Sequence, residues 1–450
     1  HARGGFRLVI GNPPWVRLHN IPPASRVALR SAFRVYREAG WEPALDARSS
    51  GFGTQIDLAA LFVERSIGLA APATSSGDGG CIALLLPAKL WRSLSGGAVR
   101  RLVDEECALR RLEDWSEAPC SFDAAVYPSI LIATRGAARG GETIVAVRRR
   151  SLDVTWPAYH GNLRLDEADS TSPWLLLPPD ARRAFDHLRA HGRSLGESAL
   201  GRVTLGVKCG CNDAFVVDAV GAQGELARIE YRGRAGSLEW SMLRPLLRGD
   251  SVAAWRVPPS RRSIIWTHAD GGAPLTSLPS EAARWLAPWR RRLRARADLR
   301  GTGVWWALFR TEAADCSRSR VVWSDFGRRP RAALLGAGDN TVPLNSCYVV
   351  PCDDNVDALT LTTLLNSPVA AAWLNAVAEP ARGGWHRYLA WTVTLLPLPR
   401  DWPRAREILA PLAERALLGD APTDDELHDA ACAAYRLRRC DMAPLVAWCG

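Results

Sequence analysis

The chain has 450 residues and a mass of 49.1 kDa, which allows about two to four domains of ordinary size. Hydrophobic residues make up 47% and charged residues 23%, so long disorder and a collagen-like repeat are excluded. No apolar run approaches the roughly 18 residues of a membrane span, and the first residues lack the pattern of a signal peptide. The eleven cysteines show no zinc-ligand spacing. We therefore expect a cytoplasmic protein with reduced thiols and no metal site.

The net charge is +10, which suits a polyanionic partner such as a nucleic acid. Lys89 and Lys208 are the only lysines, so 55 of the 57 basic residues (57 less 2) are arginine. Arginine forks fit phosphates and guanine edges. Codon bias in a GC-rich genome would give the same arginine excess, so both explanations stay open.

The first part of the chain alternates between strand and helix patterns. Short buried strands are predicted at residues 6–10, 81–87, 108–115 and 125–134, and helices at 57–70 and 96–106. Such alternation is typical of a mostly parallel α/β layer, here with some four strands.

The pattern changes along the rest of the chain. Residues 141–175 form a linker with a mixed pattern that favours strands from residue 143, and residues 176–400 mix short β segments with helices, which predicts an α+β domain. Pro288 and Pro368 should kink or split two of these helices. Residues 401–450 are predicted to be mainly helical.

Gly11-Asn12-Pro13-Pro14-Trp15 directly follows the first predicted strand. An exocyclic base amine is a poor nucleophile, and two acceptors, the Asn12 side-chain oxygen and the Pro13 carbonyl, would localise its lone pair. The prolines fix φ and remove competing N–H donors, and they keep Asn12 extended. Trp15 could stack on the base, which must be flipped out of a duplex to reach such a pocket. The site would lie at a strand carboxyl end, where open α/β sheets bind ligands.

This motif resembles motif IV of the S-adenosylmethionine-dependent adenine-N6 DNA methyltransferases of restriction-modification type. Asp57–Glu64 and Gly79–Pro87 are similar to the helix and strand that follow in that family, and Ser121–Leu131 resembles motif VIII. The resemblance implies that residues 1–140 are a partial, Rossmann-like catalytic domain. It also implies that Phe122 stacks on the flipped adenine opposite Trp15.

The resemblance continues into residues 176–400, which are similar to a TaqI-like DNA target-recognition domain. The matching segments are Gly206–Phe215, Arg244–Gly249, Leu365–Pro368 and Gly383–Trp385. The arginine run 290–296 would present a basic surface to phosphates, or it is an ordinary solvated face. The residues expected to contact double-stranded DNA are Lys208, Arg248, Arg290, Arg291, Arg382 and Trp385.

The family also has a strand and a Phe-x-Gly-x-Gly loop that hold S-adenosylmethionine before motif IV, and only eleven residues precede Asn12. Leu335-Gly336-Ala-Gly338 is the best internal candidate, but no helix pattern follows it, so we expect a recognition-domain loop. We therefore predict a fragment or a split half of an enzyme, whose cofactor lobe lies upstream or on a separate chain. The predicted strand at residues 6–10 would then leave an apolar edge open.

Two other functions fit the same residues. The chain could be a non-catalytic DNA-specificity subunit that has lost methyl transfer. Methylation of protein glutamine or of RNA uses a similar motif, but the large second domain disfavours it.

Overall fold

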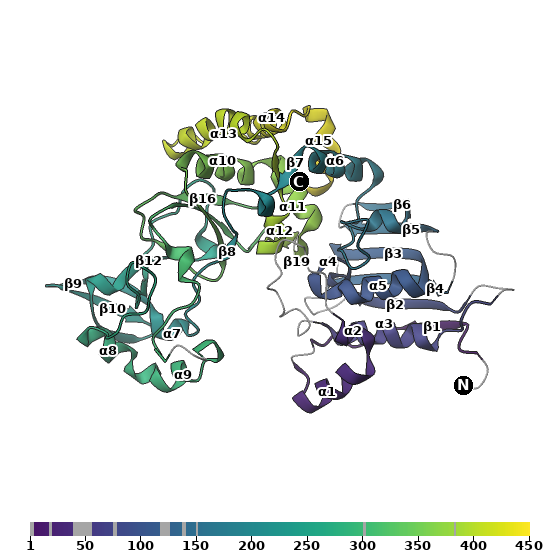
Figure 1. Ribbon diagram of the computed structural model, residues 1–450, viewed down its shortest axis with the longest axis horizontal. Coiled ribbons are helices and arrows are strands. Elements are labelled where there is room, and N and C mark those ends of the chain that lie inside the picture. The colour runs from purple at the N-terminus through teal and green to yellow at the C-terminus, as the bar shows by residue number, and fades with distance from the viewer. Residues whose placement is uncertain are drawn as a thin grey trace. The chain divides into compact units, whose positions relative to one another are not determined.

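The computed structural model describes residues 4–17, 20–38, 56–74, 79–117, 127–136, 141–149, 152–299, 303–381 and 384–450. The chain has a mixed α/β fold and divides into two compact units (Figure 1). The first unit comprises His1–Arg183, Trp373–Arg387 and Ala447–Cys449, and the second comprises Ala184–Ala372, Tyr388–Val446 and Gly450. Residues 373–387 thus join the first unit, although they lie within the range 176–400 expected for the second domain.

One six-stranded sheet organises the first unit. Its order is β1 (Leu8–Gly11), β2 (Cys81–Pro87), β4 (Pro128–Arg135), β3 (Cys107–Glu117), β5 (Glu142–Arg149) and β6 (Asp153–Tyr159). The pairs β1/β2 and β3/β5 are parallel, and the other three neighbouring pairs are antiparallel. From this pairing, β1, β2, β3 and β5 run in one direction, and their carboxyl ends share one edge.

Two predictions about this sheet were wrong. It is mixed rather than mostly parallel, because β4 runs antiparallel to both of its neighbours. The expected linker 141–175 contains β5 and β6, which extend the sheet to six strands. In β5, the buried Thr143 and Val145 alternate with the exposed Glu142 and Ile144, which is the period of a half-buried strand, whereas Ala146 and Val147 are both buried.

Alternate rows across this sheet differ in burial. Leu84, Leu131, Leu112 and Val145 are paired in register across four strands, and all are buried. Helices α3 (Leu58–Leu69) and α5 (Gly97–Glu106) pack on β2, on β3 and on each other. The other helices before the second unit are α1 (Pro23–Ala32), α2 (Arg34–Arg37), α4 (Lys89–Arg92) and α6 (Pro179–Ala190), which crosses the boundary.

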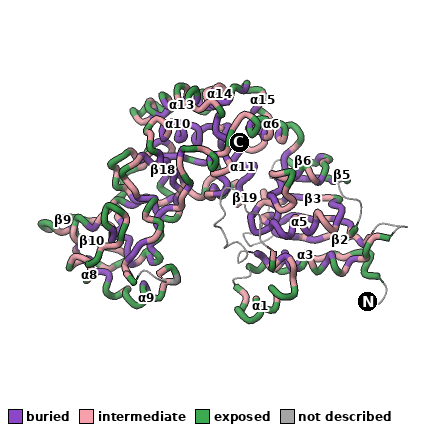
Figure 2. The backbone as a smooth tube through the Cα atoms, in the orientation of Figure 1, coloured by how far each residue is buried: buried purple, intermediate pink, exposed green. Residues whose placement is uncertain are grey.

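The adjacent row of the same sheet is partly exposed. Ile10, Ala83, Ile132, Arg111 and Ile144 are paired in register from β1 to β5. Ile10 is 77% exposed and Ile144 is 41% exposed. β1 is therefore an apolar edge strand, as the sequence predicted, and the row that it begins is exposed at Ile10 and Ile144 and half-buried between them. Figure 2 shows how burial varies along the backbone.

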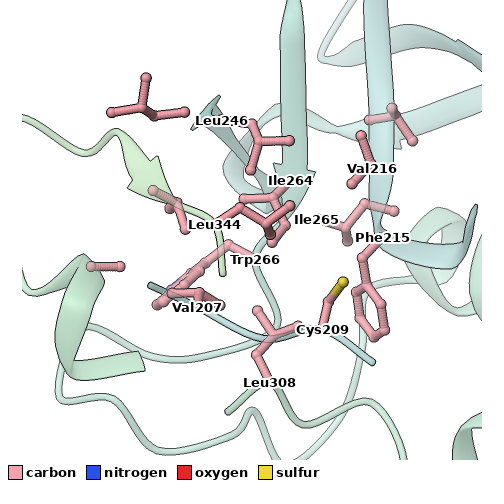
Figure 3. Packing of buried hydrophobic residues seen from close by; sticks show 14 of the residues in the cluster. Val207, Cys209, Phe215, Val216, Leu246, Ile264, Ile265, Trp266, Leu308 and Leu344 are labelled. Atoms are coloured by element: carbon pink, nitrogen blue, oxygen red, sulfur yellow. The ribbon is translucent and has the colours of Figure 1, made fainter. Parts of the chain in front are cut away.

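Three sheets lie wholly within the second unit. The largest has the order β11 (Arg234–Glu239), β10 (Leu226–Tyr231), β9 (Val216–Gln223), β13 (Arg262–Ile265), β12 (Leu243–Leu247) and β17 (Val342–Pro343). The second has the order β16 (Ala332–Leu335), β14 (Ser319–Ser324), β18 (Cys347–Cys352) and β8 (Thr204–Leu205), and the third pairs β21 (Pro397–Pro399) with β7 (Gly192–Ser194). Buried side chains from the two larger sheets and the segments beside them form a core, in which Ile264, Trp266 and Leu344 pack together (Figure 3).

Two prolines divide helices in this part of the chain. Pro288 lies in a 3-10 turn that separates two helices, and Pro368 begins a new helix, so both splits are confirmed. Figure 1 shows α10, α13 and α14 layered together. The helices in this part of the chain are α7 (Asn212–Phe215), α8 (Ser280–Leu286), α9 (Arg290–Arg294), α10 (Asn355–Asn366), α11 (Pro368–Val377), α12 (Ala390–Thr394), α13 (Trp402–Leu417), α14 (Asp424–Tyr435) and α15 (Arg439–Cys449).

The described helices include none that is long and apolar enough to span a membrane. The ten cysteines in the described ranges are free thiols, and six of them are buried. Burial raises the pKa of Cys107, Cys347 and Cys352 to about 12, so these three are neutral core side chains at physiological pH.

Candidate functional site

The Asn12–Trp15 turn leaves the sheet at the carboxyl end of β1, where Gly11 pairs with Leu84 of β2. Asn12 and Pro14 are exposed, whereas Pro13 is buried. Trp15 is half-buried and packs on the core of the first unit. Its Nε1 is buried without a hydrogen-bond partner among the described residues. The turn is therefore anchored by Pro13 and Trp15, while the Asn12 side chain is accessible.

The far end of the turn is tied to the start of α3. The Leu58 amide donates to the Val16 carbonyl at 2.7 Å, and Arg17 forms an antiparallel bridge with Asp57. Asp57 is only 3% exposed, and its Oδ1 accepts from the Ala59 amide at 3.1 Å, which caps α3. Its Oδ2 accepts from Lys89 Nζ at 2.9 Å.

A hairpin from far along the chain belongs to this same unit. It consists of β19 (Glu379–Ala381) and β20 (Trp385–Arg387), and β19 contacts α4. Burial raises the pKa of Glu379, and the charges of Arg387, Lys89 and Arg17 oppose that rise. Trp385 is 38% exposed. Among the predicted site residues, Phe122 and Arg382 lie outside the described residues.

Ion pairs lie where β3 ends, at the same edge of the sheet. Asp114 is 3.4 Å from Arg92, and Glu113 accepts from Trp115 Nε1 at 2.8 Å. Although burial acts to raise it, hydrogen bonds from Arg111, Trp115 and Arg148 lower the pKa of Glu113. Glu113 is thus ionised and already paired at neutral pH, which makes it a poor general base.

The second unit contains the other predicted DNA contacts. The Lys208 amide and carbonyl both bond to Phe309 at 2.9 Å, and Lys208 Nζ lies 3.4 Å from Asp298. Arg248 lies 3.7 Å from Asp250. The structure therefore holds Lys208 beside the residues that follow α9.

The arginine run 290–296 does not form a single basic face. Arg296 donates to the carbonyls of Cys209, Trp305 and Ala307 at 2.6–2.9 Å, so it is a structural residue. The Arg290 guanidinium lies 5.7 Å from the Trp305 ring centroid. Arg291 is exposed, and none of the ion pairs between described residues includes it. Of this run, only the arginines with exposed side chains, such as Arg291, are available to a polyanion.

Sequence reasoning missed three residues of the first unit, namely Asp57 as a buried anchor, Lys89 and Glu379. Two signals were present. Asp57 directly precedes an apolar helical pattern, which is the position of a helix cap. Lys89 is one of only two lysines in an arginine-rich chain and follows Pro87 by two positions. No local pattern links Glu379 to residues almost 300 positions earlier.

The Gly336–Gly338 loop does not fit a cofactor. It connects β16 to β17, and the buried Arg320 side chain donates to the Asp339 and Thr341 carbonyls that follow it. The backbone beyond the glycines is thus engaged in packing rather than open to a ligand. The described residues contain no cluster of side chains that could hold a metal ion.

Comparisons with known proteins relate most of the chain to one class of enzymes. Residues 1–120 match the Eco57I restriction-modification methylase family. The chain is 25% identical over 443 residues to the type II methyltransferase M.PaeR7I of Pseudomonas aeruginosa, covering 93% of this chain and 68% of that protein. It is 21% identical to the type II methyltransferase M.XhoI of Xanthomonas vasicola, covering 92% and 72%.

A solved structure gives the same relation at the level of the fold. The type IIL restriction-modification enzyme MmeI, in complex with DNA, superposes with a TM-score of 0.62 and 13% identity. The match covers 98% of this chain and 56% of that one, so the chain spans little more than half of that enzyme's length. Together these similarities relate the chain to the restriction-modification methyltransferases.

Proposed function

We propose that the chain supplies the target-base half and the recognition half of a site-specific DNA methyltransferase that modifies adenine at N6. S-adenosylmethionine would provide the electrophilic methyl group, in a restriction-modification or phage-defence system. The observation that carries the proposal is the Asn12–Trp15 turn, anchored at the carboxyl end of β1 with the Asn12 side chain accessible.

The chemistry assigned to the turn needs only the groups that it presents. Asn12 Oδ1 and the Pro13 carbonyl would accept the two amine hydrogens of a flipped adenine and raise the electron density on N6. Trp15, together with Phe122 outside the described residues, would stack on the base. Because Pro13 is buried and lacks an N–H, its carbonyl position is fixed before the base arrives.

Transfer of a tritiated methyl group to duplex DNA tests this proposal directly. The 450-residue chain is assayed alone and with a supplied cofactor lobe of a related methyltransferase. Asn12→Ala should abolish transfer without changing DNA affinity, because DNA affinity is assigned to the second unit. Transfer by Asn12→Ala at the wild-type rate would disprove the role of the turn.

A non-catalytic DNA-specificity subunit is the second candidate. The observation that favours it is that the carbonyls following Gly336–Gly338, the best internal candidate for a cofactor loop, are bonded to the buried Arg320. This candidate predicts salt-dependent duplex binding with no methyl transfer under any condition, including addition of a cofactor lobe. Transfer upon that addition would exclude it.

The exposed edge of β1 supports a missing lobe as partner. Leu8 and Ile10 are 57% and 77% exposed, and the free edge of a parallel strand can pair with another strand. We infer that a strand and helices of the cofactor lobe cover this edge and the row from Ile10 to Ile144. Ile10→Lys should prevent association with a supplied lobe in sedimentation velocity. The matched substitution at an exposed site far along the chain, Leu418→Lys, should leave association unchanged.

A further inference from the structure

Contacts at both ends of the Asn12–Trp15 turn hold it in place, and the two ends are linked to each other through one side chain. β1 pairs with β2 up to Gly11 and Leu84, and β2 continues to Pro87. At the other end of the turn, Val16 accepts from the Leu58 amide, next to Asp57. Lys89, two residues beyond β2, reaches back to Asp57 and joins the two ends. Only this last link is a side-chain ion pair.

The link between the two ends of the turn requires a cation beside Asp57, because the Asp57 carboxylate is buried. The Asp57 side chain is 4% exposed and that of Lys89 is 29% exposed, so the pair is shielded from water on the carboxylate side. Without its cation, the buried carboxylate would carry an uncompensated desolvation penalty. The nearby Glu379 lies in the field of the same lysine, which increases the local need for positive charge.

One oxygen of Asp57 caps α3 through Ala59, so the other oxygen takes the ion pair. The same division occurs at Asp354, whose Oδ1 accepts from the Val356 amide and caps α10 while its Oδ2 pairs with Arg406. The geometry at position 89 therefore requires a positive charge within reach of one carboxylate oxygen.

We propose that Lys89 is a positioning residue that fixes the Asn12–Trp15 turn through Asp57. The inference deepens the proposed function, since the turn is the group assigned to the target base. Lys89 acts through Asp57 and Leu58 on the backbone at Val16, and it need not touch the base. Arginine keeps the positive charge and should retain more of this link than methionine.

Hydrogen exchange in the 450-residue chain tests the proposal without requiring methyl transfer. The Leu58 amide, which donates to Val16, reports directly on the anchorage of the turn. In Lys89→Met this amide and that of Ala59 should exchange about tenfold faster, while amides of β4 stay unchanged. Lys89→Arg should give an intermediate rate. Lys208→Met is the matched control, because Lys208 pairs with Asp298 in the second unit and should leave Leu58 unaffected.

A second variant separates anchorage from folding. Asp57→Asn keeps an oxygen for the Ala59 amide but removes the charge that binds Lys89, so it should speed exchange at Leu58 while Ala59 stays protected. Wild-type exchange at Leu58 in both Lys89→Met and Asp57→Asn would overturn the proposal.

Kinetics link the positioning role to the reaction. With a supplied cofactor lobe, Lys89→Met should lower kcat and leave the KM for DNA unchanged. Asn12→Ala should abolish transfer without faster exchange at Leu58, so the two proposals fail separately. Faster exchange at Leu58 in a chain that never transfers methyl groups would uphold the anchor and reject the methyltransferase.

Discussion

Arg100 is the most completely buried charge of the first unit, and it has no carboxylate partner within hydrogen-bond distance in the described chain. It is 0% exposed, and its guanidinium donates to the carbonyls of Leu90, Ser93 and Thr171 at 2.6–3.1 Å. Burial lowers its pKa to about 9, which still leaves it charged at neutral pH. Arg100 thus fixes the turn that follows Lys89 by donating to these carbonyls.

Removing this guanidinium should destabilise the first unit. Arg100→Met removes the donor to the Leu90 and Thr171 carbonyls, whereas the Ser93 carbonyl keeps the Gly96 amide, and we expect a loss of about 3 kcal/mol in the free energy of unfolding. Arg65→Met is the same change at an exposed helix position and should stay within about 0.5 kcal/mol. Both free-energy changes are measured by urea denaturation, with hydrogen exchange at the α5 amides as the probe of unfolding. Equal effects of the two substitutions would contradict the structural role of Arg100.

His160 makes the stability of the first unit depend on pH. It is 4% exposed, its ring packs edge-on against Trp174, and its Nδ1 lies 3.6 Å from Asp104. Burial lowers its pKa to about 4, with Asp104 opposing the shift and Arg164 adding to it. Because the unfolded chain binds this proton near pH 6.5, stability should be intact above that pH and fall as the pH drops toward 4, by at most about 3 kcal/mol.

Comparison with His160→Gln isolates this effect from the other acid-sensitive groups. The free energy of unfolding of both proteins is measured by urea denaturation between pH 4 and 7. The wild type should lose more stability than the variant on acidification, because only the wild type carries the buried imidazole. Parallel curves would show that His160 does not titrate in this way.

At the scale of elements, local signals were sufficient where one pattern decides the structure. β2 was predicted with its bounds, since a buried apolar run ends at Pro87. β5 and β6 were missed as sheet strands because their place depends on pairing with β3, which the sequence does not show locally. The structural role of Arg296 could not be predicted from the sequence either. It fills the space beside Gly210, where an added Cβ would lie 2.6 Å from Arg296 Cδ.

Helix α14 begins with a complete capping box. The Thr423 side chain accepts from the Glu426 amide, and the Glu426 side chain accepts from the Thr423 amide. Thr423→Ala removes one half of this box, so we expect a loss of about 1 kcal/mol in the free energy of unfolding. Thr423→Ser keeps the hydroxyl and should restore most of it. Denaturation midpoints that do not distinguish alanine from serine would rule out the capping contribution.

At the scale of the whole molecule, the two units carry different candidate residues: the Asn12–Trp15 turn belongs to the first unit and the arginine run 290–296 to the second. The sequence identified the turn because its residues are consecutive. It identified the basic surface only in part, since burial decides which arginines reach solvent. Arg291 and Arg294 are exposed and have no ion pair with a described residue, whereas Arg292 lies 3.9 Å from Asp213.

Salt dependence of DNA binding tests this division of the arginines. If Arg291 and Arg294 contact phosphates, Arg291→Gln with Arg294→Gln should reduce the slope of log K against log salt by about 1 for each arginine. Arg183→Gln with Arg438→Gln removes the same charge from residues already paired with Asp180 and Asp441, and should leave the slope nearly unchanged. Fluorescence anisotropy with a labelled duplex between 50 and 200 mM salt, about the range over which such slopes are measured, provides both values. Equal slopes for the two double variants would mean that net charge alone, rather than the exposed part of the arginine run, determines DNA affinity.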